Sequence, residues 1–155
     1  MDLLFWRHAE AAAGEPDAER ALTAKGRRQA RQVAHWLAGH GPPGLEVFAS
    51  PTLRTRQTAA ALERSARILP SLAPGGDAAD LLAATPWPAG PAAWLLVGHQ
   101  PMLGRLAALL LGGEEADWSF RKGALWWLRS RHRDGIWQAQ LYTVQEPGLL
   151  PRPSA

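Results

Sequence analysis

The sequence predicts an α/β fold, in which strands alternate with helices around a central sheet. The main observation is that short apolar runs recur along the chain, most of them followed by a helical pattern or a helix-start signal. The chain also has 155 residues, of which 46% are hydrophobic, and no internal repeat is visible. We therefore expect a single domain over residues 1–145 and a loosely ordered tail over residues 146–155.

The first predicted strand and helix lie near the N-terminus. Residues 3–6 form an apolar run that predicts a buried strand ending at Arg7 and His8. Residues 11–20 are small and polar, which is typical of a loop. From Thr23 onward, alanine, valine and leucine recur at helical spacing opposite arginine and glutamine, until "GHGPPG" ends the pattern. This spacing predicts an amphipathic surface helix.

A second strand and helix are predicted in the middle of the first half. "LEVFAS" has the composition of a strand. Ser50 and Pro51 follow it and predict an N-cap and a first-turn proline for a helix that continues through about Arg64. "RILP" predicts a third, short strand.

The second half is predicted to contain another strand and helix, followed by a hairpin. Residues 72–91 are rich in alanine, glycine and proline, with at most a short helix near "DAADLLA". "AWLLVGHQP" predicts a strand, a turn containing His99, and a helix opened by Pro101 that runs to about Leu111. "GALWWLRS" and "IWQAQLYTV" flank "RHRDG", whose Asp-Gly pair is typical of a hairpin turn.

Composition excludes several classes of protein. The chain has no cysteine, so disulfides and thiolate metal sites are impossible. The longest apolar run, "MLGRLAALLLGG", is interrupted by Arg105 and is too short to span a bilayer. No signal-like N-terminus is present, which favours a cytoplasmic protein. The formal charge of +3 is spread without long basic runs, and the tryptophans lie mostly in apolar strand contexts. We therefore expect neither a membrane nor a nucleic-acid partner.

Three predicted strand ends carry residues suited to phosphate chemistry. They hold Arg7 with His8, Arg54 in "SPTLR", and His99 in "GHQP". Sheets of this class bind ligands at the carboxyl ends of their strands, and helix N-termini nearby offer unpaired N–H groups to anions. Arginine neutralises phosphoryl oxygens, and an imidazole can attack phosphorus. Convergence of these ends predicts a phosphate site. No histidine pair has a metal-ligand spacing, which disfavours zinc.

These motifs also carry a family resemblance. "RHAEA", "RALTAKGRRQA", "SPTLRTRQTA" and "GHQPML" resemble, in this order, the motifs of the histidine phosphatase superfamily, also called the phosphoglycerate mutase-like family. Their spacing is similar in particular to that of SixA-type phosphohistidine phosphatases, from about Met1 to the final hairpin. The resemblance implies a three-layer α/β/α sandwich with a mostly parallel central sheet.

The resemblance also implies roles for individual residues. His8 would be the nucleophile that becomes phosphorylated, with Arg7 and Arg54 binding the phosphoryl group. His99 would be the second histidine of the pocket, and Arg20 an additional arginine near the phosphate. The resemblance implies no metal and no cofactor.

The sequence departs from the family pattern at two points, of which the second bears on the substrate. Ala9 stands where glycine is commoner. Many relatives supply an acidic proton donor from the middle of the chain, but here "SLAPGGDAADLLAATPWPAG" contains only Asp77 and Asp80. Glu10 is a possible acid elsewhere. No long insertion is present to cover a small substrate, so an open pocket could admit a phosphorylated side chain of another protein.

The sequence thus favours a metal-independent phosphatase that works through a phosphohistidine intermediate and removes phosphate from phosphohistidine on a protein. A phosphatase of the same superfamily acting on a small phosphoester or on phosphoserine is the first alternative. A non-catalytic module that binds phosphate or a phosphoprotein is the second. His8 distinguishes the binder from the enzymes, because a binder has no use for an attacking imidazole.

Overall fold

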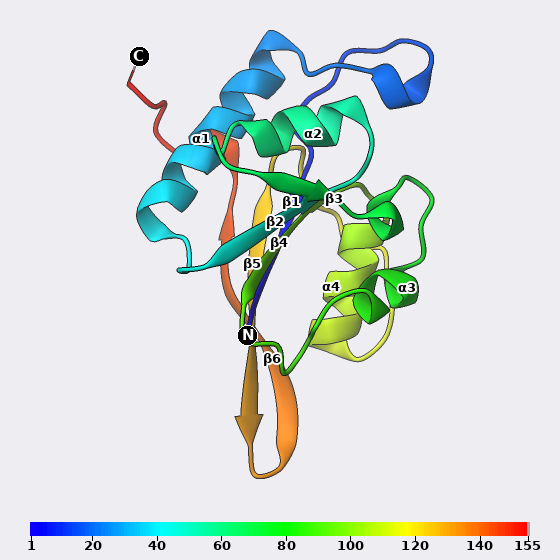
Figure 1. Ribbon diagram of the computed structural model, residues 1–155, viewed down its shortest axis with the longest axis vertical. Helices are drawn as coiled ribbons and strands as arrows, with labels where there is room; N and C mark the ends of the chain where they lie inside the picture. The colour runs from blue at the N-terminus through cyan, green and yellow to red at the C-terminus, as the bar shows by residue number, and fades with distance from the viewer. Residues whose placement is uncertain (155) are drawn as a thin grey trace.

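The computed structural model describes residues 1–154 and contains one six-stranded sheet with helices on both faces (Figure 1). The strand order is β3-β2-β4-β1-β5-β6. The four strands from β3 to β1 are mutually parallel, whereas β5 pairs antiparallel with β1 and β6 antiparallel with β5. The predicted α/β/α sandwich with a mostly parallel sheet is confirmed.

The strands are β1 (Asp2–Arg7), β2 (Leu45–Ala49), β3 (Ala66–Ile68), β4 (Ala93–Gly98), β5 (Leu125–Arg133) and β6 (Ile136–Gln145). The α-helices are α1 (Ala24–His40), α2 (Leu53–Ala60), α3 (Ala78–Ala83) and α4 (Met102–Gly112). Short 3-10 turns are η1 (Asp17–Glu19), η2 (Pro70–Leu72) and η3 (Pro147–Leu149). None of these helices is long and apolar enough to span a bilayer.

The sheet separates two hydrophobic cores, because successive side chains of a strand point to opposite faces. In β1, Leu4 and Trp6 join the core beneath α1 and α2, whereas Leu3 and Phe5 join the core beneath α3 and α4. All four side chains are fully buried. Burying a side chain of this size stabilises the fold by about 1.5–3 kcal/mol, so β1 is anchored from both sides.

The start of α1 is packed tightly against the chain that follows β1. Thr23 caps the helix, its Oγ1 accepting a hydrogen bond from the Gly26 N–H at 2.9 Å. A Cβ at position 26 would lie only 2.0 Å from the carbonyl oxygen of Glu10. Only glycine allows this approach, so Gly26 fixes α1 beside the segment that carries His8.

The second helix differs from its prediction. Thr52, not Ser50, is the N-cap residue of α2, and the helix ends at Ala60 instead of near Arg64. Ser50 does not cap the helix, because its Oγ lies against His99 and Thr52. The helix cannot continue through Glu63, whose φ of 54° lies in the left-handed region.

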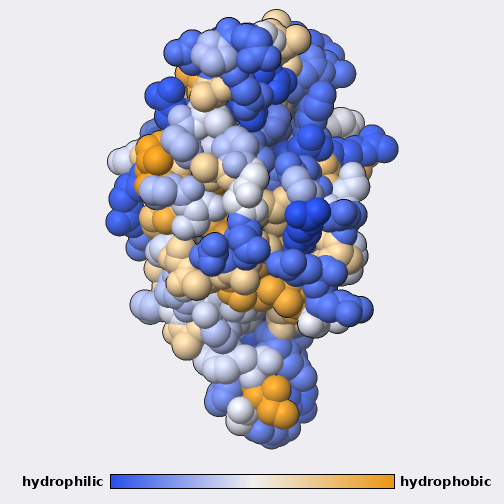
Figure 2. Space-filling model, turned by 90° about the vertical axis from the view of Figure 1, so that its right-hand side faces the viewer, coloured by the Kyte–Doolittle hydropathy of each residue, from blue (hydrophilic) through white to orange (hydrophobic). Residues whose placement is uncertain are grey.

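The final hairpin and the short third strand match their predictions. Asp134 and Gly135 connect β5 to β6, both with positive φ, at 52° and 78°. Two positive φ values are what a two-residue hairpin turn requires. The hairpin extends beyond the rest of the sheet (Figure 1), and Figure 2 shows an apolar patch at its end. Ile136 and Trp137 are exposed there.

The chain after β6 crosses α1. The side-chain amide of Gln32 donates hydrogen bonds to the carbonyls of Pro147 and Leu150, at 2.9 and 3.0 Å. These contacts hold η3 against the helix, while the boundary expected at residue 145 stays a prediction.

Candidate active site

The carboxyl ends of β1, β2 and β4 bring the two expected histidines together. These strands are parallel neighbours in the order β2-β4-β1, so they end at one edge of the sheet. His8 follows β1 and His99 follows β4 directly. Their ring centroids lie 5.3 Å apart, with the planes inclined at 56°. The His8 backbone N–H donates to the Gly98 carbonyl at 3.0 Å, which holds both strand ends in register.

His8 is arranged as a neutral imidazole with one free nitrogen. Its side chain is buried, and Nδ1 lies 2.8 Å from the Ala9 carbonyl oxygen. A carbonyl only accepts hydrogen bonds, so Nδ1 carries the proton and Nε2 keeps its lone pair. Burial lowers the pKa of His8 to about 4, helped by the positive charges of Arg54 and Arg7 and opposed by the Ala9 hydrogen bond. At neutral pH the ring is therefore uncharged and able to attack.

His99 is held by two hydroxyl groups. Its Nε2 lies 2.8 Å from Ser50 Oγ and 3.5 Å from Thr52 Oγ1. Burial lowers the pKa of His99 to about 3, and the neighbouring His8 and Arg54 lower it further in the same direction. Ser50 and Thr52 were missed as site residues, because a serine or threonine after a strand reads from sequence as a helix cap.

The two expected phosphate-binding arginines lie beside these rings with only part of each guanidinium paired. Arg7 Nη1 donates to the Phe120 carbonyl at 2.6 Å. Arg54, which is 5% exposed, donates from Nη1 to the Asp17 carbonyl at 2.9 Å. The Nε atoms of both arginines are buried and have no hydrogen-bond partner within residues 1–154. Buried cations with unpaired donors favour the binding of an anion.

Asp17 connects the remaining expected arginine to this cluster. Its carboxylate accepts from Arg54 Nη2 at 3.1 Å and from Arg20 Nη1 at 3.0 Å. Arg20 also donates from Nε to the Ala12 carbonyl at 2.8 Å. Hydrogen bonds from Arg20 and Arg54 hold the pKa of Asp17 below its usual range. Asp17 was not predicted as a site residue, although an acid three residues before Arg20 is at a spacing that allows the two side chains to pair in a turn.

Two of the three carboxylates considered as proton donors are engaged at helix starts, whereas the exposed Asp80 side chain forms no hydrogen bond or salt bridge within residues 1–154. Glu10 accepts from Thr23 Oγ1 at 3.1 Å and lies 3.7 Å from Lys25 Nζ, at the start of α1. Asp77 caps α3 by accepting from the Ala79 and Asp80 N–H groups at 2.8 and 3.1 Å. Within residues 1–154, no three histidine, aspartate or glutamate side chains are grouped to hold a metal ion.

Two buried imidazoles and two arginines with unpaired Nε atoms therefore meet at one edge of the sheet. The chain belongs to the histidine phosphatase superfamily, as its similarity to SixA shows, and the family model for branch 1 of that superfamily matches residues 3–75. It is 37% identical to the phosphohistidine phosphatase SixA of Escherichia coli (strain K12), over 74% of this chain and 76% of the relative. An uncharacterized protein from Picosynechococcus sp. is 37% identical over 99% of this chain and 97% of its own length.

Solved structures agree with this assignment. The protein histidine phosphatase SixA in complex with tungstate superposes with a TM-score of 0.78 and 31% identity, covering 96% of this chain and 98% of the other. A SixA structure from Nakamurella multipartitia superposes with a TM-score of 0.77 and 31% sequence identity. The match covers 94% of this chain and 95% of the other. A phosphoserine phosphatase from Entamoeba histolytica shares the fold, with a TM-score of 0.71 and 16% sequence identity. The match covers 94% of this chain and 96% of the other. The resemblance to SixA-type proteins is confirmed, and the chain is a phosphatase of this superfamily.

Proposed function

We propose that this phosphatase hydrolyses phosphohistidine on a protein, without a metal, through a phosphohistidine intermediate on His8. The observation that carries the proposal is the state of His8. Its Nδ1–H is directed to the Ala9 carbonyl and its pKa is lowered to about 4, so that Nε2 is an available nucleophile at neutral pH. We infer a cytoplasmic location, which suits a chain without cysteine.

In the first step, Nε2 of His8 attacks phosphorus in line with the bond to the leaving group. A new P–N bond forms to His8 while the P–N bond of the substrate breaks. The substrate imidazole departs as a neutral ring when its other nitrogen carries a proton. Arg7 and Arg54 hold the equatorial oxygens of the phosphoryl group. His99 is close to the nucleophile, with 5.3 Å between the ring centroids of His8 and His99.

In the second step, water attacks phosphorus and breaks the P–Nε2 bond. The phosphoryl group leaves as inorganic phosphate, the proton of the water passes to solvent or to the phosphate, and His8 returns to its neutral form. The arginines remain charged throughout, because a guanidinium keeps its proton even when burial lowers its pKa, as it does for Arg7.

The choice of substrate rests on the carboxylates. A serine alkoxide is strongly basic and needs a positioned acid, which typically contributes roughly 10² to 10⁴ in rate. Imidazole leaves without one, since its conjugate acid has a pKa of about 6.5. Glu10 and Asp77 are engaged at helix starts. Asp17 lies beside the arginines, but its lowered pKa keeps it ionised, so it has no proton to donate.

A substrate panel tests the proposal. We would measure kcat/KM for a phosphohistidine peptide, para-nitrophenyl phosphate and a phosphoserine peptide, each with and without EDTA. We expect the phosphohistidine and aryl substrates to be hydrolysed far faster than phosphoserine, with no effect of EDTA. Equal activity on phosphoserine would instead support a general phosphoester phosphatase, and binding without turnover of any substrate would support a non-catalytic module. If EDTA abolished activity and a divalent ion restored it, the metal-free mechanism would be contradicted.

A further inference from the structure

The two helices on one face of the sheet carry an unbalanced charge. Neither α1 nor α2 contains an acidic residue. Outside the phosphate site, their exposed cations are Lys25, Arg27, Arg28, Arg31 and Arg56. Within residues 1–154, none of these arginines forms a salt bridge. Elsewhere on the surface some arginines, such as Arg67 and Arg105, pair with carboxylates, whereas others, such as Arg131, do not. The positive charge of this face is therefore not neutralised by salt bridges of these arginines within the described residues.

This arrangement is unfavourable for the helix itself. Arg27 and Arg31 are four residues apart, so their like charges lie on the same face of α1 and repel. The first turn of α1 contains no acid of its own, and the carboxylate beside it, Glu10, lies 3.7 Å from Lys25 and does not pair with Arg27 or Arg31. Violations of a local rule without an internal compensation are expected where a surface has a function.

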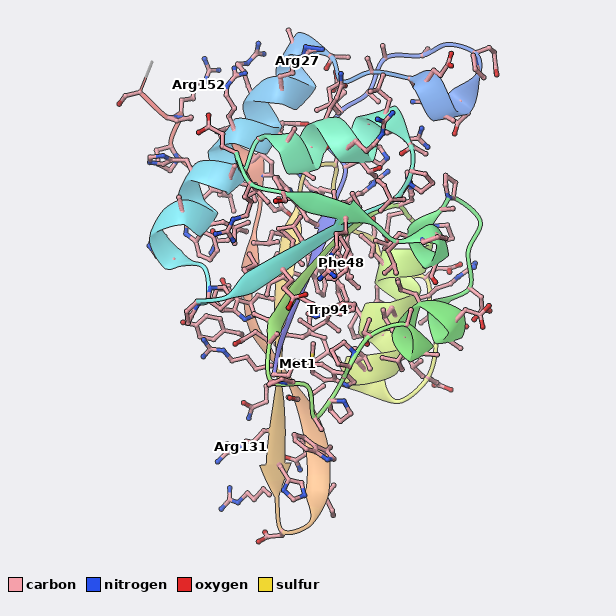
Figure 3. The ribbon with its side chains drawn as sticks, viewed as in Figure 1. Met1, Arg27, Phe48, Trp94, Arg131 and Arg152 are labelled. Carbon is pink, nitrogen blue, oxygen red and sulfur yellow. The ribbon has the colours of Figure 1, made fainter. Side chains whose placement is uncertain are left out.

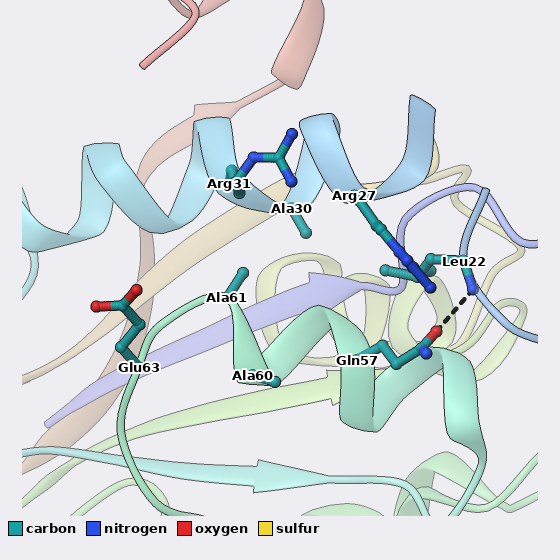
Figure 4. A pocket seen from close by; sticks show the side chains of 8 residues that line it. All are labelled: Leu22, Arg27, Ala30, Arg31, Gln57, Ala60, Ala61 and Glu63. Atoms are coloured by element: carbon teal, nitrogen blue, oxygen red, sulfur yellow. Dashed lines mark hydrogen bonds between the residues drawn. The ribbon is translucent and has the colours of Figure 1, made fainter. Parts of the chain in front are cut away.

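A groove of about 450 Å³ lies between these helices (Figure 4). Arg27 and Arg31 line it from α1, and Ala60 and Ala61 at the end of α2 add exposed apolar surface, whereas Leu22 and Ala30 at its base are almost fully buried. Glu63 is its one acidic lining residue. The groove therefore combines an apolar surface, which suits an aliphatic side chain, with two unpaired guanidinium groups, which suit carboxylates.

The groove begins next to the phosphate site. Gln57, which lines it, follows Arg54 by three residues in α2, a rise of about 4.5 Å along the helix. The Gln57 Oε1 accepts from the Leu22 N–H at 2.7 Å. Leu22 in turn follows Arg20, which is tied through Asp17 to the site. A chain whose phosphorylated side chain reaches His8 can thus extend into the groove.

We propose that this groove docks an acidic segment of the phosphorylated protein, with an aliphatic side chain between α1 and α2 and carboxylates on Arg27 and Arg31. The choice of partner rests on the function proposed above. A protein is favoured over a nucleic acid, because the groove contains no aromatic side chain on which a base could stack.

The test compares two double variants of equal charge change. Arg27→Gln with Arg31→Gln alters the groove, whereas Arg131→Gln with Arg133→Gln alters exposed arginines of the hairpin at the other end of the molecule (Figure 3). The substrates are a phosphohistidine peptide with aspartate and leucine flanks, the same peptide with glutamine for aspartate, and para-nitrophenyl phosphate. Thermal melting checks folding, and removing like charges from α1 should not lower Tm.

For the groove variant we expect kcat/KM on the acidic peptide to fall roughly 2- to 30-fold, the effect of losing two exposed ion pairs. Activity on para-nitrophenyl phosphate should stay unchanged, and the preference for the acidic peptide should disappear. The hairpin variant should behave like the wild type. An equal loss in both variants, no loss in the groove variant, or a parallel loss on para-nitrophenyl phosphate would each overturn the docking site.

A binding measurement separates this proposal from the proposed function. Fluorescence anisotropy with the unphosphorylated acidic peptide needs no turnover. If the peptide binds through Arg27 and Arg31 while no phosphohistidine is hydrolysed, the docking surface stands and the substrate assignment fails. If the groove variant binds as tightly as the wild type, the docking surface fails. Tighter, groove-dependent binding of a single-stranded oligonucleotide would replace the acidic protein with a nucleic acid.

Discussion

The lowered pKa of His8 makes the pH dependence of activity the sharpest test of the nucleophile. Attack requires the neutral ring, so activity falls as pH falls through the pKa of His8 in the free enzyme. With a pKa of about 4, about 97% of His8 is neutral at pH 5.5. With the ordinary value of about 6.5, only about 9% would be neutral at that pH. The two cases therefore differ by about tenfold in active enzyme at pH 5.5.

The assay is a profile of kcat/KM for para-nitrophenyl phosphate between pH 4.5 and about 8, corrected for the ionisation of the substrate, whose phosphate has a second pKa near about 6. Titration of the histidine ring protons by NMR gives an independent value, with His8→Asn to assign the His8 signal. Circular dichroism at each pH shows that the fold persists. A titration of His8 near 6.5 in either measurement would refute the argument from burial and from the Arg7 and Arg54 charges.

Further substitutions test the other groups of the site. His8→Ala should lower turnover by on the order of 10³ or more, and labelled phosphate should be trapped on His8 in the wild type, whereas label on His99 would reverse the assignment. Arg54→Lys should fold normally but lose roughly 10²-fold in kcat/KM, since an ammonium cannot reproduce a planar fork on two oxygens, and full activity would argue against a bidentate contact. Asp17→Ala should lower kcat/KM about 10- to 100-fold by releasing the Arg54 fork. If the carboxylate instead competed with phosphate, Asp17→Ala would lower KM and raise kcat/KM.

Much of the fold could be predicted, because several short sequence patterns fit only one kind of local structure. The apolar run of β1 could only be buried on both faces, and Asp134-Gly135 supplies the positive φ values that a hairpin turn needs. The start of α2 was less predictable. Ser50 can serve equally as a helix cap or as a partner of His99, and only the position of β4 beside β2 decides between them.

The positions of those site residues that lie at strand ends could be predicted from the sequence. Parallel neighbouring strands place His8, Arg7 and His99 at one edge whatever the loops do. The tautomer of His8 could not be predicted, because it depends on a backbone turn that directs the Ala9 carbonyl to Nδ1.

Asp17 shows why sequence reasoning stopped short of the complete cluster. It contacts Arg54 across 37 positions of the chain, and that contact depends on the path of the loop between β1 and α1. This loop is held at its ends by the close packing of Gly26 on Glu10 and by the hydrogen bond from Arg20 to Ala12. The Asp17 side chain is exposed and lies in a small, polar segment. From sequence it is therefore expected to be an ordinary solvated carboxylate. Its importance comes from its partner: Arg54 is buried, and a buried guanidinium needs a fixed acceptor to hold its remaining donors toward an anion.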